Sequence, residues 1–195
     1  SPSTIDATVS GTYTFTPHPD QCAVSQTINV TVLEATLTSI SLTSSGAFAE
    51  NQTITVFAAS AGSYLYQMDN GNFQQSHVFE NVAAGTHLIT VIDETGCSEP
   101  ISAEIIIVDY PRFFTPNGDG YNDYWSITAF NSLQNPIVSI FDRYGKLITQ
   151  ISRTTIGWDG TFNGKNLPAA DYWFTIDFTE NNIRKTFKSH FSLVR

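Results

Sequence analysis

The chain has 195 residues and a formal net charge of −9, and 14% of its residues are charged while 13% are aromatic. An acidic balance of this kind argues against nucleic acid and anionic lipid as partners, because both carry negative charge. The sequence contains no run of about 18 apolar residues, so it predicts no membrane insertion.

Short runs rich in Thr, Ser, Val and Ile, bounded by Gly, Pro, Asn and Asp, recur along the chain. β-Branched residues fit the pleated surface of a sheet, and the bounding residues are those that turns require. We therefore predict an all-β fold built from tandem Ig-like β-sandwich modules.

Two segments, Gly11–Val32 and Gly85–Val108, share one pattern. Each opens with Gly-Thr, continues with alternating apolar residues, carries a Cys eleven or twelve residues after the Gly, and closes with a second apolar run. The pattern predicts a β-hairpin in each segment, with Ile28–Val32 and Ile105–Val108 as the returning strands. Alternate residues of the opening strands share one face, namely Tyr13 and Phe15 in the first segment and Leu88, Thr90 and Ile92 in the second.

The repeat also predicts the order of the domains. Residues 1–34 are expected to be the C-terminal part of one module, so that the chain begins inside a longer protein, residues 35–109 a complete module, and residues 110–195 a third unit. We expect linkers at Leu33–Thr36 and Asp109–Arg112, little contact between the units, and no helix longer than two turns.

The charges support a boundary near Tyr110–Pro111. Residues 1–111 hold eleven carboxylates and no Lys or Arg, which gives −11, whereas residues 112–195 hold nine Lys or Arg against seven carboxylates, which gives +2. A break of this size is typical of two separate modules.

The two cysteines occupy equivalent positions in the two predicted hairpins. A bridge between Cys22 and Cys97 would require two loops at the same end of successive modules to meet. We therefore favour two free thiols over a disulfide, and two cysteines do not fix the redox compartment.

Within the middle module, Tyr64–Pro100 contains the motifs Y-x-Y-x-x-D-x-G, F-x-x-x-x-x-G-T and V-x-D-x-x-G-C in that order. The segment resembles the SprB-type repeat of giant adhesins of gliding Bacteroidota. His87 stands where that family usually has Tyr, and the Cys usual near the start of the module is absent from Ser39–Phe48. The resemblance implies that the module belongs to a large cell-surface adhesin.

The third unit shows the period-2 alternation of β-strands. Tyr172, Phe174, Ile176 and Phe178 alternate with more polar residues, which predicts one buried face. The same reasoning predicts strands at Arg112–Thr115, Trp125–Ala129, Ile137–Phe141, Lys146–Ile151, Tyr172–Phe178 and Lys185–Val194. The segments FDRYGK and TENNIRK are expected to be hairpins, and the unit a small sandwich.

Four motifs occur in order between Arg112 and Arg195, namely FFTPNGDGYNDYWSI, VSIFDRYGKLI, GWDGTFNGKNLPAADYWFTIDF and HFSLVR. In this order they resemble the gliding-motility-associated C-terminal domain, the type B sorting signal of the type IX secretion system. The resemblance implies a secreted protein that is exported across the outer membrane to the cell surface. Ala170 and Ser189 stand where that family often has Gly, so a positive φ at either residue would be strained.

The same resemblance implies recognition by outer-membrane components of the secretion machinery, among them an SprF-class partner. The strand Lys185–Arg195 is the expected contact, because it ends the chain and a sheet edge can pair with a strand of another protein. The alternative is that the basic residues of residues 112–195 merely solvate hairpins. The residues assigned to recognition are Lys185, Lys188, Phe191, Leu193 and Arg195.

The segment TPNGDGYND has three interpretations. A phosphate cradle is excluded because no helix follows it. A weak Ca²⁺ site would use the side chains of Asn117, Asp119 and Asp123 with the Tyr121 carbonyl, but alignment with an EF-hand loop loses both terminal carboxylates. We favour a turn cluster in which the Asn and Asp side chains accept backbone N–H groups, and the chain has no certain cofactor.

No catalytic pattern accompanies the four histidines, which are spread over different modules. The pairs Asp119/Asp123 and Asp159/Asp171 occupy turn positions, and Trp125, Trp158 and Trp173 are favoured as core residues over a sugar-stacking platform. The three Trp residues belong to the third unit.

We therefore predict no enzyme. The predicted function is that of the C-terminal fragment of a large secreted gliding adhesin whose last domain is a sorting signal. The alternatives are a calcium- or carbohydrate-binding β-sandwich module of a secreted protein, and a hydrolase fragment with two converging carboxylates in a cleft.

Overall fold

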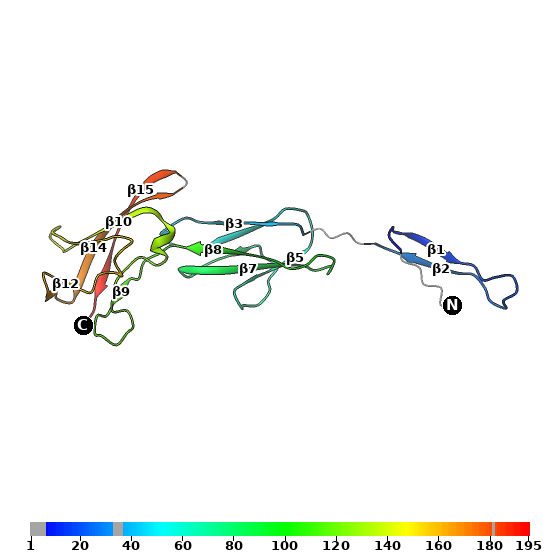
Figure 1. Cartoon of the computed structure of the whole chain (residues 1–195), viewed down its shortest axis with the longest axis horizontal. Coiled ribbons are helices and arrows are strands. Elements are labelled where there is room, and N and C mark those ends of the chain that lie inside the picture. Colours follow the sequence, from blue (N-terminus) through cyan, green and yellow to red (C-terminus); the bar gives the residue numbers. More distant parts are fainter. Residues whose placement is uncertain (1–6, 33–36, 181) are drawn as a thin grey trace.

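The computed structural model describes residues 7–32, 37–180 and 182–195 (Figure 1). Within these ranges the regular structure consists of β-strands and one 3₁₀ helix of three residues, η1 (Phe130–Ser132). The predicted all-β class is confirmed. The predicted linker Leu33–Thr36 lies outside the described residues, and no described helix has the length and apolar character to cross a membrane.

The first strands form the predicted hairpin. β1 (Gly11–Phe15) pairs antiparallel with β2 (Gln26–Val30), from Gly11 opposite Val30 to Phe15 opposite Gln26. Tyr13 and Phe15 are half-buried on one face, as their period-2 spacing requires.

The middle unit contains two antiparallel sheets of three strands each, in the orders β3-β4-β6 and β5-β7-β8. Their strands are β3 (Ile40–Ser44), β4 (Ile54–Ala58), β5 (Tyr64–Met68), β6 (Val78–Phe79), β7 (Gly85–Asp93) and β8 (Ile101–Ile107). Side chains of both sheets meet in one hydrophobic cluster that includes Ile54, Val56, Ile89 and Val91, all at most 1% exposed.

The hairpin predicted at Gly85–Val108 is formed by β7 and β8, which pair from Gly85 opposite Ile107 to Val91 opposite Ile101. The core-facing residues of β7 are Ile89 and Val91. Leu88, Thr90 and Ile92 do share one face, but it is the more exposed face of the strand.

The C-terminal unit is built on a five-stranded sheet in the order β11-β10-β14-β15-β9. Its strands are β9 (Phe113–Phe114), β10 (Gln134–Phe141), β11 (Leu147–Ile151), β14 (Ala170–Glu180) and β15 (Ile183–Leu193). β9 runs parallel to the end of β15, and the other neighbours are antiparallel. Five of the six predicted strands are therefore present.

The predicted strand Trp125–Ala129 is wrong. The segment makes isolated bridges, one of them between Trp125 and Trp158, and Ala129 adopts a left-handed φ of 59° before η1. Trp125 and Ile127 both point into the core, 0% and 4% exposed, so the segment packs across the sheet and does not extend it. The sequence interpretation also missed the short pair β12 (Thr161–Phe162) and β13 (Lys165–Asn166).

Aromatic side chains dominate the C-terminal core. Phe191 stacks on Trp125 with ring centroids 3.8 Å apart, and Trp158 meets Tyr172 edge-on at 4.9 Å. The predicted buried face of β14 is confirmed, since Tyr172, Phe174, Ile176 and Phe178 are all below 5% exposed. Ala170 and Ser189 lie within β14 and β15 and are not among the residues with positive φ, so the strain considered for them is absent.

The prediction of little contact between the middle and C-terminal units is wrong. Phe48, from the loop between β3 and β4, belongs to the hydrophobic cluster of the C-terminal unit. The predicted linker Asp109–Arg112 is packed as well, because Asp109 bridges to Thr128 and Tyr110 contacts Phe174 at 4.8 Å. A long-range contact made by one loop residue leaves no periodic pattern in the sequence.

Candidate functional site

β15 carries the residues that the sequence assigned to recognition, and its two faces differ. Phe191 and Leu193 are 1% and 2% exposed and belong to the core. Their side chains cannot meet a partner while the unit is folded, so their contribution is to stability. Lys185 and Lys188 are exposed.

The outer edge of β15 is unpaired over most of its length. β9 bonds to its end, where the N–H of Ser192 donates to the Arg112 carbonyl at 2.9 Å. Backbone N–H groups of alternate residues point the same way, so those of His190 and Lys188 also face away from β14. Among the described residues no strand pairs with this edge before Ser192. An unpaired edge of this kind can accept a strand of another chain.

Lys185 is already engaged within the chain. Its Nζ donates to Glu180 Oε2, and Glu180 Oε1 accepts the N–H of Ala47 at 3.1 Å. Burial alone would raise the pKa of Glu180, but the hydrogen bonds from Lys185 and from the Ala47 N–H outweigh it and lower the pKa. Lys185 therefore belongs to the contact between two units.

Arg195 is held by the C-terminal unit itself. Its Nε donates to the Leu167 carbonyl at 3.1 Å, and one terminal nitrogen donates to the Gly160 carbonyl at 3.2 Å. Lys188, by contrast, makes no hydrogen bond or ion pair within the described part of the chain. Of the assigned recognition residues, it alone presents an exposed basic side chain beside free backbone groups.

The turn cluster predicted for TPNGDGYND is confirmed. Asp123 accepts the N–H groups of Gly118 and Gly120 at 2.6 and 2.8 Å, Asn117 accepts that of Asp119, and Asp119 accepts that of Tyr121. The bonds from the Tyr121 N–H and the Asn117 side chain lower the pKa of Asp119.

The calcium interpretation stays a prediction. The four residues lie together in one exposed loop, but both Asp123 oxygens already accept backbone N–H groups. In the described ranges, no group of three or more His, Cys, Asp or Glu side chains is placed to hold a metal.

We expect Asp123→Ala to lower the free energy of unfolding of the C-terminal unit by about 1 kcal/mol for each of the two bonds lost. Asp119→Ala removes one backbone bond at a fully exposed site and should have the smaller effect. Urea unfolding followed by Trp fluorescence measures both. In the same protein, calorimetric titration with Ca²⁺ should give no sub-micromolar binding, and such a site would contradict the turn interpretation.

His87 has a role that the sequence interpretation missed. Its Nδ1 lies 2.8 Å from Asp69 Oδ2, and its Nε2 lies 2.9 Å from the Ala83 carbonyl. Both neighbours are acceptors, so the doubly protonated ring satisfies both bonds and a neutral ring satisfies one. Burial alone would lower the pKa of His87, but the bonds to Asp69 and Ala83 outweigh it and raise the pKa.

We therefore expect the stabilising effect of His87 to be complete below its pKa in the unfolded chain and to be lost as the pH rises through its higher folded pKa. The pKa of Asp69 is lowered by the same hydrogen bond, so Asp69 remains ionised across this range. NMR titration of the imidazole, with unfolding curves of the native chain and His87→Gln, measures the effect. A folded-state pKa at or below the unfolded value would contradict it.

The other candidates do not assemble into a site. Trp125 and Trp158 are buried, so the three Trp side chains do not form an exposed row. Cys22 and Cys97 are free thiols, as favoured from their positions. Asp159 accepts the N–H and hydroxyl of Thr161, which is a turn role.

The described geometry defines a small aromatic-cored β unit with one long edge strand, attached to an all-β module. Residues 108–193 match the family model of the CHU_C Type IX secretion signal domain. A signal of this type indicates export across the outer membrane, to the cell surface or the medium.

Other comparisons give distant likenesses. No curated protein matches the chain. One solved structure, described as "Biofilm associated protein - BSP domain", shares 14% identity over 79% of this chain and 29% of that chain, with a TM-score of 0.26. Another, described as "Structure of surface layer protein SbsC, domains 4-9", shares 12% identity over 89% of this chain and 34% of that chain, with a TM-score of 0.19. This chain thus spans well under two thirds of either.

Proposed function

We propose that residues 110–195 are a folded sorting signal that outer-membrane components of the type IX secretion system, including an SprF-class partner, recognise through the free edge of β15. The unit carries out no chemistry. Residues 35–109 and residues 1–34 are proposed to be SprB-type modules of a gliding adhesin, the first complete and the second partial.

The unpaired edge of β15 carries this proposal. The backbone groups of Lys188 and His190 face outward, and a partner strand bonded to them would extend the five-stranded sheet. Lys188 adds a positive charge beside these groups, so an acidic strand is the better fit. Residues 108–193 of this unit match a secretion signal domain, which supports the proposal that the secretion machinery recognises this unit.

The repeated hairpins support the adhesin modules. β1-β2 and β7-β8 have the same Gly-Thr opening and the same antiparallel pairing. Residues 1–111 carry no Lys or Arg, which keeps a string of such modules acidic and mutually repelling.

The test is surface display of a reporter fused before residue 1 of the chain, in a bacterium that has the secretion system. The native chain should carry the reporter to the surface, and Lys188→Glu should reduce display while the unit stays folded. Lys165→Glu is the matched control, since Lys165 is an exposed residue of β13 in the same unit, and β13 pairs with β12. Equal display of both variants would contradict recognition by the charge of Lys188, and no display of the native chain would contradict the proposed function.

A further inference from the structure

The loop between β3 and β4 inserts one aromatic side chain into the neighbouring unit. The ring of Phe48 stacks on Phe187 with centroids 4.6 Å apart and planes 10° apart, and it meets Phe178 edge-on at 5.5 Å. Phe48 is 8% exposed although it lies in a loop of the middle unit. It fills a recess between Tyr110 and the β14-β15 hairpin.

Two backbone N–H groups of this loop are held by hydrogen bonds, one to each neighbouring part of the chain. The N–H of Phe48 donates to the Val108 carbonyl at 3.1 Å, and the N–H of Ala47 donates to Glu180 at 3.1 Å. Phe48 has a φ of 62°, a left-handed conformation that is unfavourable for a bulky residue. A conformation of this kind persists where the surrounding contacts hold it.

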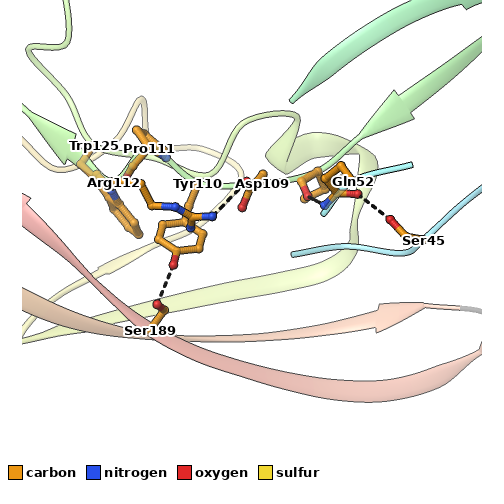
Figure 2. A network of polar contacts seen from close by, with 9 residues as sticks. Ser45, Gln52, Asp109, Tyr110, Pro111, Arg112, Trp125 and Ser189 are labelled. Atoms are coloured by element: carbon orange, nitrogen blue, oxygen red, sulfur yellow. Dashed lines mark hydrogen bonds and ion pairs between the residues drawn. The ribbon is translucent and has the colours of Figure 1, made fainter. Parts of the chain in front are cut away.

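A second set of bonds fixes the loop to the chain segment that joins the units. Gln52, 5% exposed, donates from Nε2 to the Val108 carbonyl at 3.3 Å, and it accepts the Ser45 hydroxyl at 3.1 Å. The Val108 carbonyl therefore receives the Phe48 N–H and the Gln52 amide together. Figure 2 shows the Ser45–Gln52 pair beside the segment that leads to Tyr110.

The connecting segment itself is braced against the C-terminal unit. The Tyr110 hydroxyl lies 2.6 Å from Ser189 Oγ, and Arg112 lies over the Tyr110 ring at 3.7 Å while it pairs with Asp109 at 3.3 Å (Figure 2). Trp125 Nε1 donates to the Pro111 carbonyl at 2.8 Å. Because these contacts hold the connecting segment against the C-terminal unit, the two units have little freedom to move as separate bodies.

We infer that the recess formed by Tyr110, Phe178, Glu180 and Phe187 is a docking site for the Gly46–Phe48 loop, and that the two units unfold as one cooperative body. The body that carries the signal domain then runs from residue 37 to residue 195 and exceeds the matched residues 108–193. Phe187 and Glu180 lie on the β14-β15 hairpin, so the loop also holds the start of β15. The inference concerns folding and does not depend on the proposed function.

The three Trp residues provide a selective readout, because all of them lie in the C-terminal unit. In the full chain, Phe48→Ala should lower the denaturant midpoint of the unfolding reported by Trp fluorescence, although Phe48 belongs to the middle unit. Phe57→Ala is the matched control: Phe57 lies in β4 of the same unit and is 49% exposed. Its Trp-reported midpoint should equal that of the native chain.

The double variant Phe48→Ala/Phe187→Ala tests the contact itself. If the two rings act together, the double variant should be little worse than the more damaging single variant. Additive shifts, or equal midpoints for Phe48→Ala and Phe57→Ala, would overturn the inference. If Phe48→Ala fails to fold, Phe48→Leu is compared with Phe57→Leu by Trp fluorescence. A lower midpoint for Phe48→Leu alone supports the inference, and equal midpoints for the two variants overturn it.

Discussion

Phe191→Ala is expected to lower the free energy of the unfolding reported by Trp fluorescence by about 3–5 kcal/mol. Phe191 is 1% exposed, stacks on Trp125 at 3.8 Å and lies 5.9 Å from Phe114. Removal of its ring leaves a cavity between the sheet and the segment that crosses it. Denaturant unfolding followed by Trp fluorescence measures the change, and Trp125 emission should change in the folded state.

Phe113→Ala is the matched control for this loss. Phe113 is 53% exposed in β9, so its removal deletes an aromatic ring of the same size without a core cavity. We expect a change below about 1 kcal/mol for an exposed side chain of this kind. If Phe191→Ala behaved like Phe113→Ala, the placement of β15 against Trp125 would be wrong.

Gly157→Ala is expected to destabilise the same unit by a different route. Gly157 has a φ of 152°, and a Cβ placed there would lie 2.8 Å from the Trp125 carbonyl oxygen. That oxygen accepts the N–H of Trp158 at 2.9 Å, so the clash falls on a backbone bond that cannot easily move. The strained backbone alone costs about 1–3 kcal/mol, and the clash should add to it.

Gly164→Ala separates the two causes. Gly164 also has a positive φ, 71°, but a Cβ there would have no neighbour within 4 Å. It therefore shows the effect of backbone strain without the clash. Thermal unfolding of both variants should give the larger loss for Gly157→Ala, and equal losses would argue against the close approach of Gly157 to Trp125.

The sequence correctly predicted the parts of the fold in which apolar and polar residues alternate regularly along a strand. The period-2 pattern of Tyr172 to Phe178 placed the buried face of β14 correctly, and the Asx residues of the 117–123 loop predicted a cluster of turns. The same pattern led to a wrong strand prediction for residues 125–129. Its aromatic and β-branched residues favour a strand, but they serve to cover the sheet, and Ala129 turns the chain into η1.

The candidate site was predicted less well, because its decisive contacts are long-range. Phe48 stands alone among small residues, so nothing in its surroundings indicates that it packs on Phe187. The pairing of Lys185 with Glu180 depends on the register of the β14-β15 hairpin. Composition alone therefore did not distinguish Lys185 from Lys188. Among the described residues Lys185 pairs with Glu180, whereas the Lys188 side chain has no such partner.

Surface display of the reporter by the Lys188→Pro chain tests the central claim most directly. The N–H of Lys188 faces away from β14, so proline should block an added strand without removing a bond of the β14-β15 pair. Trp-monitored unfolding must first show that the variant is folded. We predict that this folded variant is retained in the cell while Lys165→Glu is displayed like the native chain. Display of the folded Lys188→Pro chain at the native level would contradict recognition through the edge of β15.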